Sequence, residues 1–259
     1  MTNYAIPSLS LAAGIALLAA GCGPERPPGI QIDPVLARYI TADALAVAGI
    51  HLDQLQKSSL YMRHKGELQL PGTAGDMREL LLVWDGKGLL TGGLGAAGKQ
   101  VSLSGDPRAV RAGTQAAKNG TGKLPNELRP SLDWLPATDP VWLASRGLPL
   151  EGVPMRSEYA SLLSNFRGHV RSTAAGLGID SGLHLRARID CVSETGSRRI
   201  DDALRAAIGI ARIRSTQNER ELYDAIHVKR SGVAVFIDAD LSPEASDRLL
   251  ARLSPARNH

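Results

Sequence analysis

The chain has 259 residues, of which 43% are hydrophobic and 22% are charged, and its formal net charge is +4. This composition is ordinary for a globular protein of one large or two small domains. Aromatic residues make up only 4%, too few for the stacking platforms that bind single-stranded nucleic acid. We therefore expect no nucleic acid partner. The mild positive charge permits contact with anionic lipid or polymer but does not require it.

The N-terminal segment carries no charged side chain. Its first 21 residues contain no Lys, Arg, Asp or Glu, and Leu9 to Ala20 is almost wholly apolar or small. This run is shorter than the ~20 apolar residues that span a bilayer, and it fits the core of a secretory signal. A buried N-terminal helix of a cytoplasmic protein fits less well, because the run leads into Gly23-Pro24 and Pro27-Pro28, which break helices.

The apolar run ends in the stretch LAAGC, Leu18 to Cys22, which resembles the lipobox of bacterial lipoprotein precursors. The resemblance implies that residues 1–21 are a signal peptide and that Cys22 carries lipid, which anchors the mature protein to a membrane of the cell envelope. By the sorting habit of enteric lipoproteins, Gly23 implies the outer membrane, facing the periplasm. An ordinary cleaved signal with an incidental cysteine is the alternative interpretation.

The rest of the chain is predicted to be a tether followed by two halves. Residues 22–34 are rich in Pro and Gly and have no periodic apolar pattern, as in a linker. The first half, residues 35–136, is predicted to contain a strand at Ala44–Ile50, a short helix from Asp53, a hairpin of Glu79–Trp84 and Leu89–Leu94 turned by Asp85-Gly86, a strand at Val101–Leu103, a helix capped by Asp106 that stops at Asn119-Gly120, and a helix at Asn126–Leu135.

The second half, residues 137–259, shows a similar succession of patterns. We expect strands at Val141–Ser145, Val170–Ala175 and Leu183–Cys191, helices at Glu158–Phe166 and Glu194–Ile213, a hairpin of Ala225–Lys229 and Val233–Ala239, and a final helix capped by Ser242. Each half therefore reads as strand, helix, strand, strand, helix, strand, which is the split βαβ or ferredoxin-like order. The predicted fold is α+β, with two ferredoxin-like halves that have antiparallel sheets and helices on one face.

Two strand patterns of the first half carry a loose resemblance. The stretches DALAVAGI, Asp43 to Ile50, and LLVWDGKGLL, Leu81 to Leu90, resemble segments of exported bacterial proteins of unassigned function. The resemblance implies a fold of this class and no particular activity.

Sequence motifs for cofactors and catalysis are incomplete. The glycine-rich stretch at 91–100 follows a predicted strand, but Gln100 stands where a phosphate loop needs a hydroxyl, and no helix follows. The stretch at 238–244 resembles a calcium loop, but Pro243 and Leu249 stand where Gly and Glu are needed. The common hydrolase and metalloprotease motifs are missing from the sequence. We therefore expect no nucleotide, no metal and no other cofactor.

The predicted strand LHLRARIDC, Leu183 to Cys191, alternates strictly between apolar and polar residues. Cys191 falls on the apolar side, where a free thiol acts as a small hydrophobic group. If Cys22 is lipidated, Cys191 has no partner for an intrachain disulfide. A reactive thiol is the alternative interpretation.

The polar side of that strand supplies the candidate binding residues. In the hairpin strand AIHVK, the polar positions also point away from the apolar side. If both strands share a sheet, we expect an open, basic face that meets an envelope protein or an anionic ligand. The alternative is a solvated face, or an internal seam with acidic partners. The residues concerned are His184, Arg186, Arg188, His227 and Lys229.

These patterns predict a membrane-anchored envelope lipoprotein that serves as a non-catalytic binding or structural module. The alternative is an envelope hydrolase or transferase whose site is assembled from distant residues. Titratable side chains that gather in one pocket with perturbed pKa values would favour the enzyme.

Overall fold

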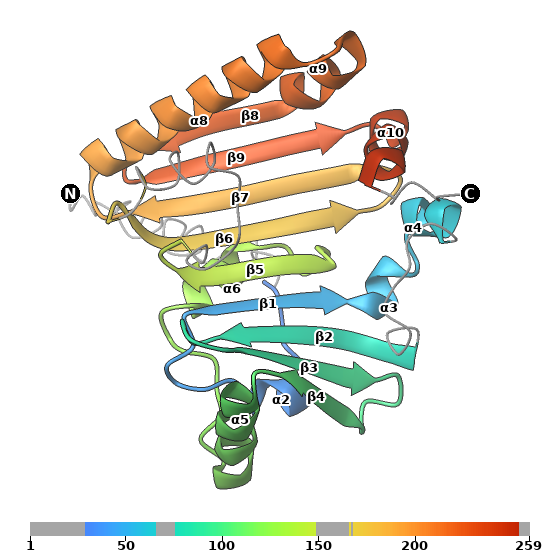
Figure 1. Cartoon of the computed structure of the whole chain (residues 1–259), viewed down its shortest axis with the longest axis vertical. Helices are drawn as coiled ribbons and strands as arrows, with labels where there is room; N and C mark the ends of the chain where they lie inside the picture. The colour runs from blue at the N-terminus through green and yellow to red at the C-terminus, as the bar shows by residue number, and fades with distance from the viewer. Residues whose placement is uncertain (1–28, 66–75, 149–165, 167, 254–259) are drawn as a thin grey trace, which may run out of the picture.

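The strands of both halves join in one continuous sheet (Figure 1). The computed structural model describes residues 29–65, 76–148, 166 and 168–253. Within these residues, nine strands form an open antiparallel sheet in the order β4-β3-β2-β1-β5-β6-β7-β9-β8, which confirms the α+β class. The strands are β1 (Ala46–His51), β2 (Met77–Trp84), β3 (Leu89–Gly95), β4 (Val101–Gly105), β5 (Val141–Arg146), β6 (Val170–Ile179), β7 (Leu183–Cys191), β8 (Ile226–Ser231) and β9 (Ala234–Leu241).

The helices are α2 (Pro34–Ala37), α3 (Leu52–Leu55), α4 (Ser59–His64), α5 (Pro107–Asn119), α6 (Arg129–Trp134), α8 (Glu194–Arg214), α9 (Gln217–Asp224) and α10 (Pro243–Leu253). Several helices, among them α2, α4, α5 and α8, begin at a residue whose side chain caps them. Asp106 accepts hydrogen bonds from the backbone N–H groups of Arg108 and Ala109, and Gly120 ends the same helix at φ 67°, a backbone conformation that favours glycine. Most of the helix predicted at Glu158–Phe166 lies outside the described residues.

The two predicted ferredoxin-like halves are not confirmed, because the strands pair in a different order. A split βαβ unit places a third strand between its first two, whereas β1 and β2 are direct antiparallel neighbours, with Ala46 opposite Trp84. The connecting helices explain the difference. A six-residue helix such as α4 rises only about 9 Å, too little to run back along a strand of eight residues such as β2. The described part of the β1–β2 connection, which contains α3 and α4, therefore holds no helix long enough to cross the sheet.

Each face of the sheet can be followed across it through directly opposed residues. We call face 1 the side that carries Val47, and face 2 the opposite side. Residues opposite each other on neighbouring antiparallel strands point to the same side of the sheet. One row of face 1 therefore consists of Leu90, Val83, Val47, Ala144, Ala174, Arg188, Phe236 and Lys229. Face 1 changes along this row from apolar core to charged surface.

Helices of the first half lie on both faces of the sheet, contrary to the prediction of helices on one face, because Leu52 and Leu55 of α3 pack with Ile50 and Leu80 on face 2. In the first half, α5 packs on face 1, where Gly113 approaches Leu90. In the second half, α8 packs on face 2, where Ile200 joins Ile189, Cys191 and Val235 in a buried cluster. The strand patterns account for the change, because face 1 is apolar on β1 to β3 and polar on β7. Figure 1 shows α5 beside the first strands and α8 along the last ones.

The last residues of the predicted tether pack into the fold. Ile30 is completely buried in the core under α2, α5 and α6. Its backbone N–H donates to the carbonyl of Leu132, and Gly29 forms an isolated bridge with Pro136. Residues 29–33 therefore belong to the fold, and residues 1–28, which include Cys22, lie outside the described residues.

Candidate functional site: an apolar pocket with a polar rim

An apolar pocket of about 530 Å³ lies between face 2 of the sheet and four helices, α3, α4, α9 and α10. Leucine side chains of the central strands form its floor, among them Leu177 of β6 and Leu185 of β7. The walls come from Leu60 of α4, Leu222 of α9 and Leu249 of α10. The volume lies within the ~300–1,000 Å³ range of pockets that bind small molecules.

The alternation of β7 creates the floor of this pocket. Leu183 and Leu185 point to face 2, while Arg186 points to face 1. Leu185 is 41% exposed, although β7 lies between β6 and β9. A leucine on an inner strand is usually covered. The exposure of Leu185 shows that no helix of the described chain fills the space above it.

Ion pairs link three of these helices, α4, α9 and α10. The carboxylate of Asp247 on α10 lies 3.0 Å from Nη2 of Arg63 and 2.8 Å from Nε2 of His64, both on α4. The next residue, Arg248, pairs with Glu221 on α9. We call these five side chains the polar rim. The rim joins α10 to both other walls, and Leu249 and Leu250 of α10 line the pocket itself.

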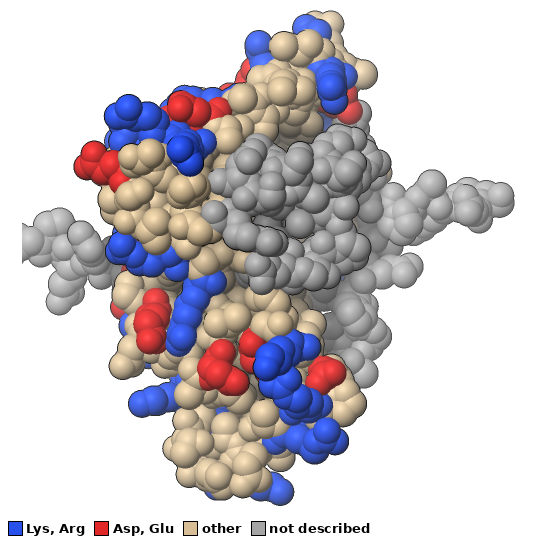
Figure 2. Space-filling model, turned by 60° about the vertical axis from the view of Figure 1, so that its left-hand side comes forward, with Lys and Arg blue, Asp and Glu red and all other residues tan. Residues whose placement is uncertain are grey.

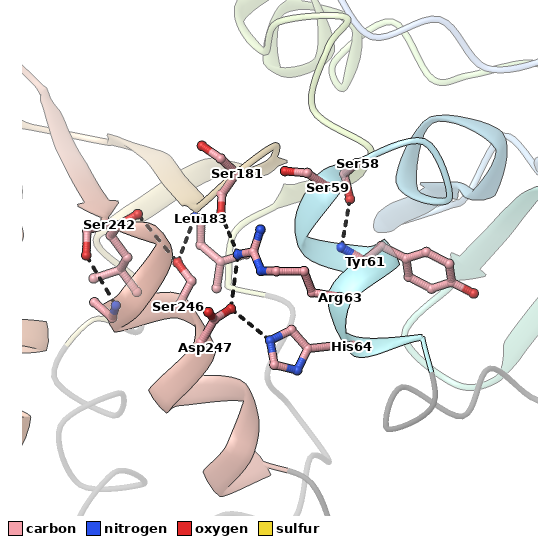
Figure 3. Close-up of polar contacts among 12 residues, drawn as sticks. Ser58, Ser59, Tyr61, Arg63, His64, Ser181, Leu183, Ser242, Ser246 and Asp247 are labelled. Carbon is pink, nitrogen blue, oxygen red and sulfur yellow. Dashed lines mark hydrogen bonds and ion pairs between the residues drawn. The ribbon is translucent and has the colours of Figure 1, made fainter.

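The turn between β6 and β7 holds two of these walls in place. The backbone carbonyl of Asp180 accepts hydrogen bonds from the Leu60 N–H and the Ser59 hydroxyl of α4. On the other side, the Ser246 hydroxyl of α10 accepts from the Leu183 N–H, at 3.0 Å. Figure 3 shows α4 and α10 side by side, with Asp247 between them and Arg63 and His64 turned toward it. The two helices therefore share one support on the sheet.

The five side chains predicted to bind an anionic partner do lie on one face, but they are not alone there. Strand β9 separates β7 from β8 and contributes carboxylates to face 1. His184 pairs with Asp240 at 2.8 Å, Arg188 pairs with Asp190 at 2.8 Å, and His227 lies opposite Asp238. The predicted basic face is therefore a patch of mixed charge. Figure 2 likewise shows positive and negative side chains interspersed on the side that it presents.

Arg186 contacts a buried carboxylate that the sequence did not suggest. Asp139 is 1% exposed, its Oδ2 has no hydrogen-bond partner, and that atom lies 3.3 Å from Nε of Arg186. Burial raises the pKa of the Asp139 carboxyl, while the charges of Arg186 and His184 oppose the shift. The same residues line a groove of about 400 Å³ together with Lys57 of the α3–α4 connection. This groove is the second candidate site.

Two glycines of β6 make room for that carboxylate. A Cβ atom at Gly176 would lie 2.3 Å from Oδ2 of Asp139, and one at Gly178 would lie 3.2 Å from Oδ1. Glycine inside a strand often marks the close approach of another group. The spacing of glycine in AGLGI, residues 175–179, is therefore the sequence signal that could have revealed the groove.

A third titratable group lies inside the fold, away from both sites. Glu79 of β2 is buried, and its Oε2 lies 3.8 Å from Nδ1 of His51 on β1. Nε2 of His51 accepts a hydrogen bond from Nε1–H of Trp142 at 3.2 Å. Burial raises the pKa of Glu79 to about 7 and lowers the pKa of His51. This cluster controls stability and does not line either candidate site.

Comparison with known protein families, curated proteins and solved structures finds no match for this chain. Among the helices that the structure describes, none is both long and apolar enough to cross a bilayer. The function must therefore be argued from the pocket, the groove and the N-terminal sequence.

Proposed function

We propose that this protein is a membrane-anchored, non-catalytic binding module of the cell envelope, and that its apolar pocket holds a hydrophobic ligand. The pocket is the observation that carries the proposal. Apart from Tyr61 and Tyr223, its described lining consists of leucine, isoleucine and alanine. Such a lining supplies no carboxylate, imidazole, amine or thiol for catalysis. It favours binding, because apolar surface gains free energy when it leaves water.

The lipid anchor proposed at Cys22 fits this function. Acyl chains on the N-terminal cysteine would hold the fold close to a membrane, where apolar molecules are concentrated. The cationic side chains of β7 and β8 are less suited to be the primary site, since Arg186, Arg188 and His184 already have carboxylate partners. We therefore assign ligand binding to the pocket.

The proposal is tested with a pair of leucines of equal exposure. Leu185 is 41% exposed on the pocket floor, and Leu89 is 42% exposed on β3, outside the pocket lining. In the unlipidated Cys22→Ala chain, Leu185→Lys should abolish binding of an environment-sensitive apolar dye, because it places a charge in an apolar site. Leu89→Lys should bind as before. Equal binding by both variants, with unchanged circular dichroism, would show that the pocket is not the site.

The groove at Asp139 supports a second candidate, an envelope hydrolase or transferase. A buried carboxyl with a raised pKa, next to a guanidinium in a groove, is a common setting for general acid–base catalysis. The test is a panel of chromogenic esters, phosphoesters and glycosides with the Asp139→Asn variant. Hydrolysis that this substitution abolishes, while the fold stays intact, would establish the enzyme. If the unmodified chain hydrolyses none of these substrates, the hydrolase candidate is refuted.

A further inference from the structure

The polar rim narrows the class of ligand that the pocket can hold. An apolar pocket in open contact with water suits any hydrophobic molecule, but charged side chains of α4 and α10 lie within one helical turn of the leucines that line this pocket. Arg63 and His64 follow Leu60 by three and four residues, and Asp247 precedes Leu250 by three, spacings that place residues on the same face of a helix. A molecule that fills the pocket and reaches the rim must therefore be apolar along most of its length and polar at one end.

The size of the pocket favours one aliphatic chain over two. If a methylene group takes about 30 Å³, the volume of a water molecule in the liquid, a pocket of about 530 Å³ holds on the order of 18 methylenes. A lipid with two long chains would have to leave one of them in water.

The charges of the rim favour a carboxylate at the polar end. Asp247 is held by two side chains of α4, with contacts of 3.0 Å from Arg63 and 2.8 Å from His64. The rim thus already accommodates one carboxylate. Because the Arg63 and Asp247 side chains are each 40% exposed, their pairing is weak and open to competition. A ligand carboxylate could therefore take the place of Asp247 beside Arg63.

We propose that the pocket binds a single-chain fatty acid, with its alkyl chain against Leu185 and its carboxylate at Arg63 and His64. Binding would release Asp247 and loosen the link between α10 and α4. The inference rests on the proposed function, since it names the ligand class of the same pocket. It goes beyond that function because it requires that the ligand has a single alkyl chain and an anionic end.

The test compares four probes on the unlipidated Cys22→Ala chain by isothermal titration. Palmitate should bind with a stoichiometry of one. Hexadecanol, which has the chain without the charge, should bind at least 10-fold more weakly. Octanoate should bind at least 100-fold more weakly, because each methylene left out removes apolar burial. A one-chain phosphate lipid, lysophosphatidic acid, tests whether the rim selects carboxylate, and affinity equal to that of palmitate would overturn the assignment to a fatty acid.

Matched arginine variants separate the rim from general charge effects. Arg63→Gln should weaken the binding of palmitate about 10-fold and leave the affinity for hexadecanol unchanged. Arg108→Gln removes an ion pair with Asp85 that lies outside the pocket lining, and it should change the affinity for neither probe. If palmitate and hexadecanol bind with equal affinity to the unlipidated chain and to both arginine variants, the proposed carboxylate site is wrong, but the apolar pocket is still a binding site. If neither probe binds, the proposed function fails as well.

Discussion

Asp247 and Arg248, neighbours on α10, pair with two different helices, α4 and α9. The two leucines that follow them line the apolar pocket. One turn of α10 therefore both lines the pocket and pairs by charge with two other helices of the pocket wall. We expect this helix to be the part of the pocket wall that moves when a ligand enters, because its links to the other walls are exposed ion pairs, which stabilise a fold only weakly.

The first prediction concerns the link between α10 and α4. Asp247→Asn should speed amide hydrogen exchange in α10 without a large shift in the midpoint of thermal unfolding, since the substitution removes two ion pairs but no buried contact. Asp224→Asn, which breaks an exposed pair with Arg212 instead, is the matched control. Unchanged exchange in the Asp247 variant would show that the ion pairs do not hold the helix.

The same link should depend on pH in a defined direction. Hydrogen bonds from His64 and Arg63 lower the pKa of Asp247 from its ordinary value of 3.8. A lowered pKa means that the link contributes fully at neutral pH and is lost as the pH falls through the lowered value. Exchange in α10 should therefore be faster at pH 3 than at pH 5 after correction for intrinsic rates, and equal corrected rates at these two pH values would contradict the link.

The second prediction concerns Glu79. Its pKa rises from 4.5 to about 7 on folding, so the folded chain holds the Glu79 proton more tightly than the unfolded chain. The stability that this contributes is present below pH 4.5 and is lost as the pH rises through 7. Each pKa unit corresponds to about 1.36 kcal/mol. Between pH 4 and pH 8 the unmodified chain should therefore lose roughly 3 kcal/mol of unfolding free energy through Glu79, and the Glu79→Gln variant should not show this loss.

Urea unfolding at the two pH values measures this difference. The neighbouring charged groups that bear on Glu79 are Asp33, Arg78 and Asp53, and all of them remain in the variant. Glu127→Gln, at a carboxylate that is 65% exposed, is the control and should show the same loss as the unmodified chain. An identical pH dependence in the unmodified chain and the Glu79 variant would contradict the buried, protonated carboxyl.

The third prediction is that Cys191 is inert. Its side chain is fully buried between α8 and the sheet, and burial raises the pKa of its thiol. It should resist thiol reagents until the chain unfolds, and Cys191→Ala should cost on the order of 1 kcal/mol as a small cavity. A cysteine introduced at the exposed Leu89 is the positive control for labelling. Labelling of Cys191 as fast as that control would support the reactive interpretation.

The fourth prediction is the lipid anchor. Mass spectrometry of the native N-terminus should show acylated Cys22, and Cys22→Ala should release the protein from membranes. A mature chain that starts at Met1, or that stays on membranes without Cys22, would refute the anchor.

The sequence predicted individual elements well where the pattern is local. Strand β7 has the predicted bounds, Leu183–Cys191, because the alternation of apolar and polar residues is complete. Helix α9, Gln217–Asp224, was missed because it has no sustained apolar stripe. Its start is instead marked by the capping box of Thr216 and Glu219.

The arrangement of the elements could not be read from local patterns. The predicted halves assumed that each strand finds its partners within its own half, whereas β1 pairs with β5 across them. The pocket was missed for the same reason, since Leu60, Leu185 and Leu249 are far apart in the sequence. Each of them reads singly as a core residue. Asp139 was missed because its properties come from burial over Gly176, and only the glycine spacing of β6, at residues 176 and 178, points to that close approach.

The most direct test of the central claim is native mass spectrometry of the unlipidated Cys22→Ala chain, purified without detergent and without added ligand. We predict one additional aliphatic molecule per chain, which organic solvent removes and which the Leu185→Lys variant lacks while the Leu89→Lys variant retains it. If the chain instead shows its bare mass, and fails to take up palmitate when it is supplied, the apolar pocket is not a ligand site.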